Sequence, residues 1–120
     1  MSNYQMGEME ALFADIIWEN EPLTSMELAH RAEEAFGWKK TTSYTVLKRL
    51  CGKGIFRNDK AVVTSCMSKA EYTAARSEQF VDSTFEGSLP AFLTSFLGRK
   101  KLTEAEAKEL HRIVDEYREE

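Results

Sequence analysis

Residues 39–60 carry the side chains best suited to chemistry with a partner, because they combine cations with short hydroxyls and one tyrosine. Lysine can donate to guanine, threonine can meet thymine, and both lysine and arginine can neutralise phosphates. This segment holds seven basic residues against one acid, whereas residues 1–38 hold one base against eight acids. A basic island in a chain with an overall charge of −4 is typical of a nucleic-acid footprint. A solvated charged face without a partner is the alternative.

The side chains expected to contact DNA fall into two groups. Those assigned to the base edges of the major groove are Lys40, Thr41, Thr42, Tyr44, Thr45 and Lys48. Those assigned to phosphates are Arg49, Lys53, Arg57 and Lys60, with Lys39 in the same basic segment. For Thr42 and Thr45, the alternative is a hydrogen bond to the backbone of their own helix. For Tyr44, the alternative is packing against the segment that follows the helix.

The sequence contains few residues that could form a metal site or a catalytic site. Two cysteines, Cys51 and Cys66, and two histidines, His30 and His111, are too few for a four-ligand zinc site within one chain. No glycine-rich phosphate loop, nucleophile–histidine grouping or His-x-x-Glu-His pattern is present. We therefore expect no enzymatic activity, no metal and no cofactor. The cysteines are interpreted as reduced thiols, with a redox or soft-metal site as the alternative.

The elements that must position the basic segment are mainly helices. Apolar periodicity predicts an amphipathic helix over residues 7–20, and Pro22 prevents its continuation. A capping box at Thr24–Glu27 opens a second helix that Gly37 ends. A third helix is predicted over residues 40–53. The predicted inner residues are Met9, Leu12, Phe13, Ile16 and Ile17, then Leu28, Ala29, Ala32 and Phe36, then Val46, Leu47 and Leu50, and the predicted polar face of the third helix is Thr41, Thr42, Ser43, Tyr44, Thr45, Lys48 and Arg49.

Two β-rich runs follow the third helix. Residues 55–57 and 61–66 flank Asn58-Asp59-Lys60, which predicts a hairpin with its turn at those three residues. Three helices followed by a hairpin is the order of a winged helix-turn-helix, whose third helix reads DNA. The predicted fold class is therefore mainly α with a small β-hairpin, with a winged-helix DNA-binding domain over residues 1–67.

Residues 68–120 predict a three-helix dimerisation region. Capping boxes at Ser68–Glu71 and Thr103–Glu106 open the first and last of these helices, and Ser88 and Pro90 open the middle one. Such a short tail buries its own apolar side chains poorly, and a twofold dimer would cover them. Folding of the tail back on its own winged helix is the alternative. The residues assigned to the dimer interface are Phe80, Leu89, Phe92, Leu93, Phe96, Leu97, Leu110, Val114 and Tyr117.

Several motifs occur together in an order that is typical of one protein family. Around the third helix the chain reads W-x3-T-x2-T-x-L-x-R-L-x2-K-G, from Trp38 to Gly54. Ile17-Trp18, residues 85–89, Leu102-Thr103 and Glu109-Leu110 add further matches in the same order. This sequence resembles the penicillinase-repressor family, the BlaI/MecI-type repressors, which also includes copper-responsive CopY-type members. The resemblance implies a homodimeric repressor that binds a palindromic operator upstream of genes for β-lactam resistance or a related stress or transport function.

The resemblance also implies a release mechanism. In β-lactam-responsive members, a membrane sensor protease leads to cleavage at an Asn-Phe bond in the dimerisation region. The matching bond here is Ser95–Phe96, so serine stands where the family has asparagine. Copper-responsive members carry Cys-x-Cys pairs near the carboxyl end, and no cysteine follows Cys66. The possible proteolytic site is therefore Ser95 and Phe96, and copper sensing by that route is excluded.

The sequence also gives an expectation for the cellular location of the protein and leaves one alternative function open. Residues 1–8 lack the basic start and apolar run of a signal peptide, and no apolar run approaches the ~20 residues that cross a bilayer. We expect a cytoplasmic protein without membrane insertion. The alternative function is a winged-helix protein-interaction module without DNA sequence specificity, with the acidic residues 1–38 as its interaction face.

Overall fold

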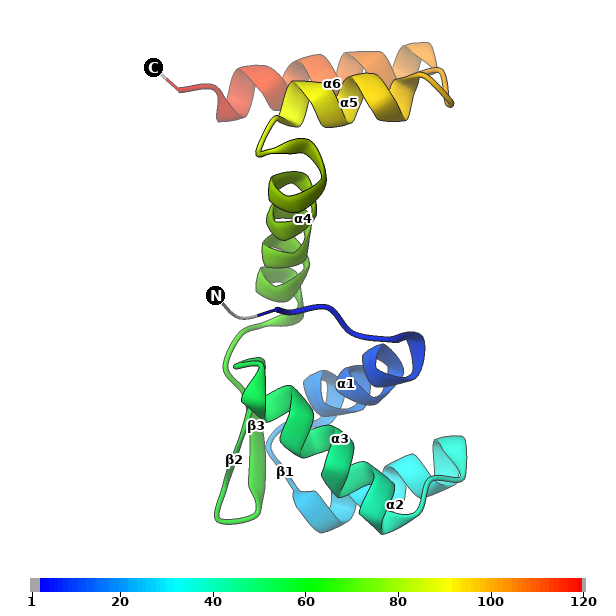
Figure 1. The fold of residues 1–120 in the computed structure, drawn as a ribbon, viewed down its shortest axis with the longest axis vertical. Coiled ribbons are helices and arrows are strands. Elements are labelled where there is room, and N and C mark those ends of the chain that lie inside the picture. The colour runs from blue at the N-terminus through cyan, green and yellow to red at the C-terminus, as the bar shows by residue number, and fades with distance from the viewer. Residues whose placement is uncertain (1–2, 120) are drawn as a thin grey trace. The chain divides into compact units, whose positions relative to one another are not determined.

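The computed structural model describes residues 3–119, which form two compact units divided between Glu78 and Gln79, called unit 1 and unit 2. The predicted fold class is confirmed: the chain is mainly α with a small antiparallel sheet, in the order of a winged helix followed by a helical region (Figure 1). Among the described residues, no helix is long and apolar enough to span a membrane. The elements are α1 (Glu8–Asn20), β1 (Leu23–Thr24), α2 (Ser25–Phe36), α3 (Lys40–Gly52), β2 (Phe56–Asp59), β3 (Val62–Ser65), α4 (Lys69–Phe85), α5 (Leu89–Leu97) and α6 (Glu104–Tyr117).

The sheet has three strands in the order β1-β3-β2, one more than the hairpin that the sequence predicts. Leu23 of β1 pairs with Val63 of β3, and Phe56 of β2 pairs with Ser65. The Ser25 amide continues the β1 pairing by donating to the Ala61 carbonyl at 2.9 Å. A two-residue strand has no periodicity to read, which is why the sequence pattern did not reveal it.

The predicted position of the hairpin turn is wrong by two residues. Asn58 and Asp59 belong to β2, and Asp59 pairs with Val62, so the turn consists of Lys60 and Ala61. Both turn residues have positive φ, 51° and 67°, as a two-residue turn with the twist of its strands requires. Glycine or asparagine usually fills these positions, and their absence hid the turn from the sequence pattern.

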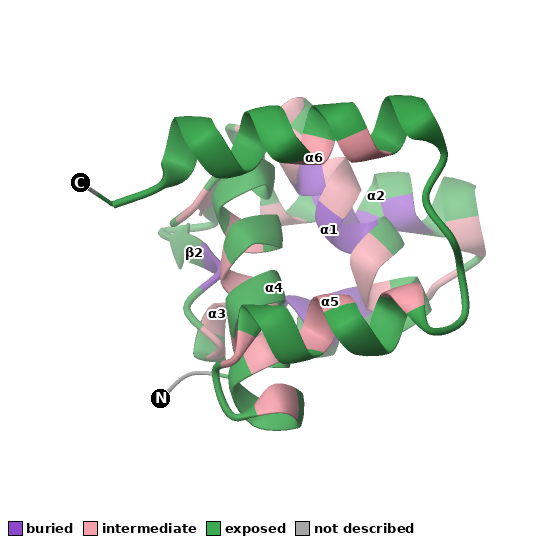
Figure 2. Ribbon diagram, turned by 90° about the horizontal axis from the view of Figure 1, so that it is seen from above, coloured by how far each residue is buried: buried purple, intermediate pink, exposed green. Residues whose placement is uncertain are grey.

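The core of unit 1 is formed by α1, α2, α3 and the sheet, and Figure 2 shows buried segments along α1 and α2. On α1, the buried residues are Phe13, Ala14 and Ile17. Met9 and Leu12, predicted to be in the core, are 42% and 46% exposed. The buried face of α1 is therefore rotated toward Phe13 and Ile17, and Leu12 lies at the opposite edge of the apolar stripe.

The helix ends confirm most of the predicted capping. Ser68 and Glu71 cap α4 reciprocally, and Thr103 and Glu106 cap α6 in the same way. Thr24 accepts from the Glu27 amide at 3.0 Å, but the Glu27 carboxylate lies 3.5 Å from Arg31. The predicted return arm of the α2 capping box is therefore replaced by an ion pair within the helix.

Unit 2 differs from unit 1 in having no core of its own. None of residues 79–119 is fully buried. Its aromatic side chains still gather, because Phe92 lies with its ring centroid 5.9 Å from Phe80, 5.6 Å from Phe85 and 6.0 Å from Phe96. A partly exposed aromatic cluster of this kind leaves apolar surface in contact with water.

Candidate nucleic-acid interface

Helix α3 has one face that packs in the core and one face that is exposed. Val46, Leu47 and Leu50 point into the core of unit 1, as the sequence predicted. Ser43 joins them at 1% exposure, so its predicted place on the polar face is wrong. Ser43 lies three residues before Val46 and four before Leu47, which puts it on the inner face of a helix with 3.6 residues per turn. The outer face then presents Thr41, Tyr44, Thr45 and Lys48, all exposed and spaced by three or four residues.

The hydroxyls on this outer face are not equivalent. The Thr45 hydroxyl donates to the Thr41 carbonyl at 2.8 Å, which is the backbone bond named as the alternative to a DNA contact. That bond uses the hydroxyl hydrogen only, so the methyl group and the acceptor lone pairs of Thr45 remain available. Tyr44 is 39% exposed on the same face. The outer face of α3 therefore offers a methyl, an aromatic edge and hydrogen-bonding oxygens to a groove.

Five cations of the basic segment have no acidic partner. Within residues 3–119, none of them forms an ion pair with an aspartate or glutamate. Three belong to α3 and the residue before it, and two belong to the hairpin, where one occupies the turn. Their charge is therefore not neutralised within the chain and is available to a polyanion. These unpaired cations are Lys39, Lys40, Lys48, Arg57 and Lys60.

Arg49 and Lys53, also assigned to phosphates, have partners in the structure. The Arg49 guanidinium lies 3.2 Å from the Glu10 carboxylate of α1. The Lys53 ammonium donates to the backbone carbonyl of Gln5. The Gly7 amide, followed by Arg49 and Lys53, lowers the pKa of Glu10 below its ordinary value, against the opposing effect of partial burial. Both cations thus fasten the last turns of α3 to α1 and to the segment that precedes it.

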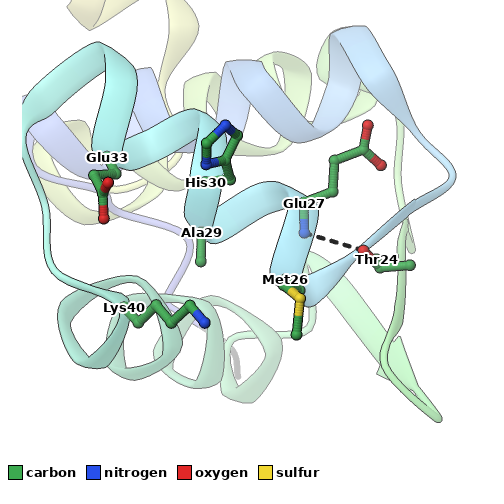
Figure 3. Close-up of a pocket in the computed structure, with 7 residues that line it drawn as sticks. All are labelled: Thr24, Met26, Glu27, Ala29, His30, Glu33 and Lys40. Atoms are coloured by element: carbon green, nitrogen blue, oxygen red, sulfur yellow. Dashed lines mark hydrogen bonds between the residues drawn. The ribbon is translucent and has the colours of Figure 1, made fainter.

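A hollow of about 430 Å³ borders the start of α3 (Figure 3). The side chains that surround it come from Thr24 of β1, from α2 between Met26 and Glu33, and from Lys40 of α3. Figure 3 shows Lys40 running along α3 toward Met26, with the Thr24 cap of α2 beyond it. Because the hollow lies beside Lys40, it forms one border of the recognition face. Its lining residues are Thr24, Met26, Glu27, Ala29, His30, Glu33 and Lys40.

The two cysteines lie at the base of the hairpin. Cys51 is in the last turn of α3, and Cys66 directly follows β3. Burial raises the pKa of the Cys51 thiol, and the nearby Cys66 raises it further. A raised pKa lowers the fraction of reactive thiolate. Among the described residues, no group of three metal-ligating side chains forms.

The residues assigned to the dimer interface lie in unit 2 and are largely exposed. Phe80, Leu89, Phe96, Val114 and Tyr117 are between 44% and 76% exposed. Phe92, Leu93, Leu97 and Leu110 are half-buried and line an apolar groove of about 350 Å³ between α5 and α6. Ser95 and Phe96 lie inside α5, and both are exposed. Unit 2 therefore presents a continuous apolar surface to its surroundings.

Comparison with known proteins decides what kind of protein carries these two surfaces. A family model described as Penicillinase repressor matches residues 6–116, which span both units. The chain belongs to the penicillinase-repressor family. A Penicillinase repressor from Bacillus licheniformis is 25% identical over 118 residues, which cover 95% of this chain and 92% of the relative.

Membership in the penicillinase-repressor family confirms the resemblance found in the sequence. This membership places the chain in the class of DNA-binding transcriptional repressors. Members are transcriptional regulators, so the family also confirms the prediction that the protein is not an enzyme. For this penicillinase-repressor family member, the exposed face of α3 and the unpaired cations next to it form the candidate DNA interface.

Several contacts that support this interface were missed by sequence reasoning. Glu10 lies on α1 among acids that look equivalent in the sequence, yet it alone of these accepts from Arg49. The carbonyls of Tyr4 and Gln5 accept from Tyr72 and Lys53, which are 68 and 48 residues away. No local spacing rule relates positions so far apart. The one available signal was that Glu10 lies three and four residues before Phe13 and Ala14, on the helical face that turns toward the core.

Proposed function

We propose that this protein is a homodimeric repressor that binds a palindromic operator through the outer face of α3 and the β2–β3 hairpin. The observation that carries this proposal is the set of five unpaired cations, Lys39, Lys40, Lys48, Arg57 and Lys60, around an exposed row of hydroxyls. A face selected only for solubility would pair such cations with acids. Lys40 and Lys48 would meet base edges, with Thr41, Thr42, Tyr44 and Thr45, and the other cations would meet phosphates.

The proposed dimer rests on the apolar surface of unit 2. Helices α5 and α6 expose or half-expose their leucines and phenylalanines, and no residue of either is fully buried. Pairing with a second copy would remove this surface from water and would place two α3 helices on one duplex, as the two-fold symmetry of a palindrome requires. Folding of the tail onto its own winged helix is the competing outcome, and it would give a monomer.

The proposed target is an operon for β-lactam resistance or a related stress or transport function, because a relative bears the name Penicillinase repressor. We propose that the protein acts in the cytoplasm, where an operator is accessible. Release by a membrane sensor protease would require cleavage near Ser95–Phe96. Both residues are exposed, but the bond lies within α5, so the helix must open locally before a protease can bind it in extended form.

The test is selection of bound fragments from sheared genomic DNA of the source organism, with Lys48→Glu as the disrupting variant. Lys100→Glu is the matched control, because Lys100 is also an exposed lysine but lies between α5 and α6. We expect the wild type and the control variant to enrich one palindrome and the Lys48 variant to enrich none, while all three sediment as dimers.

Two results would contradict the proposal. If the Lys48 variant enriches the same palindrome with the same affinity, α3 does not read the operator. If no sequence is enriched by any of the three proteins, sequence-specific binding fails, and the protein is better described as a winged-helix interaction module. A monomer at micromolar concentration would contradict the dimer independently of DNA.

A further inference from the structure

The segment before α1 connects α3 with α4. The Gln5 carbonyl accepts from the Lys53 ammonium at the end of α3. The neighbouring Tyr4 carbonyl accepts from the Tyr72 hydroxyl of α4 at 2.8 Å. Glu10, at the start of α1, holds Arg49 of α3 at 3.2 Å. Residues 4 and 5, called the strap below, therefore contact the recognition helix through one carbonyl and α4 through the next.

Tyr72 is the centre of a second set of contacts at the start of α4. Its ring centroid lies 5.5 Å from that of Trp18 and 6.5 Å from that of Tyr4. Trp18 in turn packs on the buried Phe56 of β2, with centroids 5.0 Å apart, and its indole nitrogen donates to the Met67 carbonyl at 3.0 Å. Tyr72 is thus wedged against α1, the strap and, through Trp18, the hairpin.

One more contact joins the same turn of α4 to α1, and a cap orders the turn itself. The Lys69 ammonium lies 2.8 Å from the Asp15 carboxylate of α1, which raises the pKa of Lys69. Ser68 and Glu71 fix the first residue of the helix by reciprocal capping. Met67, Lys69 and Tyr72 are therefore each held to α1 or to the strap by a separate bond, so the first turn of α4 cannot tilt on the winged helix without breaking several contacts.

The direction of α4 matters because the helix is long. Its 17 residues extend about 25 Å at 1.5 Å per residue. A tilt of about 15° at its base would displace its far end by about 7 Å, which is roughly two base-pair steps along DNA. A small change in the tilt of α4 at Tyr72 would therefore cause a large change in the distance between the two recognition helices of a dimer.

We infer that Tyr72 and the strap are positioning elements that set the half-site spacing this repressor accepts. This inference rests on the proposed function, because spacing has meaning only for a dimer on a palindrome. The DNA contacts give affinity for each half-site, while the anchoring of α4 determines whether both half-sites can be occupied together. Tyr72 acts through α4 and does not itself touch DNA.

A measurement without DNA tests the anchoring itself. Spin labels at Glu34→Cys and Ser83→Cys, in a chain with Cys51→Ala and Cys66→Ser, report the distance between α2 and the far part of α4. Dilution with unlabelled protein restricts the signal to one chain, so neither a dimer nor an operator is needed. We expect Tyr72→Ala to widen the distance distribution, because a tilt of about 15° at the base of α4 moves its far end by about 7 Å, and Tyr72→Phe to widen it less because the ring is kept.

A second measurement uses the operator recovered by genomic selection, with its half-sites moved apart or together by one to four base pairs. The wild type should prefer its best spacing over one displaced by two base pairs by about tenfold, and Tyr72→Ala should reduce this preference to below about threefold. Affinity for an isolated half-site should not change. Thr73→Ala is the matched control, because Thr73 is the adjacent, exposed residue of α4.

The outcomes are distinguishable. A distance distribution as narrow as that of the wild type in folded Tyr72→Ala protein overturns the inference, as does equal broadening by Thr73→Ala. Should Tyr72→Ala fail to fold, Tyr72→Phe decides, and unchanged width together with an unchanged spacing profile overturns the role of the strap. Failure to recover any operator would contradict the proposed function. The spin-label result would still test whether Tyr72 holds α4 on the winged helix.

Discussion

The ion pair between Glu10 and Arg49 gives a prediction that separates two roles for Arg49. The sequence assigns Arg49 to a phosphate, whereas the structure places its guanidinium 3.2 Å from the Glu10 carboxylate. We propose a double-mutant cycle with Glu10→Gln, Arg49→Met and the combined variant. Glutamine keeps an oxygen for the Gly7 amide, which donates to Glu10 at 3.1 Å, and removes the charge and the second oxygen, which accepts from Arg49.

The expected coupling energy follows from the exposure of the pair. Exposed ion pairs contribute about 0.2–1 kcal/mol. The Arg49 side chain is 51% exposed, which discounts the interaction, but Glu10 is only 18% exposed. We therefore expect about 0.5–1 kcal/mol of coupling at pH 7, measured by urea denaturation. A coupling below about 0.3 kcal/mol, near the limit of additivity, would refute a structural role for the pair.

The same pair predicts a pH dependence. The pKa of Glu10 is lowered in the folded protein, so its stabilising effect is complete above the ordinary value of 4.5 and is lost as the pH falls through the lower folded pKa. The coupling energy should therefore remain constant between pH 6 and 8, begin to fall below pH 4.5 and disappear once the pH is below the lowered folded pKa. Coupling that persists unchanged at pH 2 would show that the carboxylate charge is not its source.

DNA binding then decides between the two roles of Arg49. About three or four phosphate contacts per protomer predict a slope of log K against log salt between about −5 and −7 for the dimer. If Arg49 is held by Glu10, Arg49→Met should leave this slope unchanged. If Arg49 binds a phosphate in each protomer, the slope should fall in magnitude by about 1.8, because each lost contact removes about 0.9.

Three further substitutions test other features of the structure. Ser43→Ala should raise the free energy of unfolding by about 1 kcal/mol in urea denaturation, because the buried hydroxyl has no hydrogen-bond partner among the described residues; a loss of stability would contradict that. Ala61→Gly should stabilise by about 0.5–1 kcal/mol, because Ala61 has a φ of 67°, and no gain in Tm would argue against strain at the turn. Leu93→Asp should convert a dimer into a monomer in sedimentation, since it places a charge in the groove of unit 2, and an intact dimer would place the interface elsewhere.

The sequence predicted the features whose cause is local. The caps at Ser68, Ser88 and Thr103 depend on a hydroxyl and an amide three residues apart, and all three form. Helix bounds follow the same logic, because capping residues, Gly37 and Pro90 act on their immediate neighbours. The division of α3 into an apolar and a polar face also follows from its 3.6-residue period, with Ser43 as the exception.

The apolar stripe of α1 shows where periodicity becomes insufficient. At 100° per residue, its five apolar side chains from Met9 to Ile17 cover an arc of about 140°, which is wider than one packed face. Phe13 and Ile17 lie at one edge of that arc and are buried, and Leu12 lies at the other and is 46% exposed. Only the positions of α2 and the sheet, which the pattern does not contain, decide which edge faces inward.

The contacts of the strap could not be predicted because they depend on backbone carbonyls. A carbonyl is present in every residue, so Tyr4 and Gln5 carry no side-chain signal for the bonds they accept. Tyr72 and Lys53 look like an ordinary aromatic and an ordinary surface cation in the sequence. Their contacts with the strap depend on tertiary placement, which explains why the sequence did not reveal them.

A last prediction follows from the absence of acids in residues 35–58. Elsewhere the helices pair their cations locally, as Glu27 with Arg31 and Glu104 with Lys108 do. A glutamate at position 45 of α3 would gain helix propensity over threonine and would lie three and four residues before Lys48 and Arg49. Thr45→Glu should therefore raise stability by about 0.5 kcal/mol.

The same substitution should weaken DNA binding strongly. In a dimer it places two negative charges on the exposed face of α3, among cations that have no acidic partner, and we expect a loss of affinity of about a hundredfold at 0.1 M salt. Thr45→Gln is the control, since it has similar size and helix propensity without the charge. Greater stability combined with lower affinity would show that this face is kept free of acids for binding. Undiminished affinity would mean that DNA does not approach α3 here.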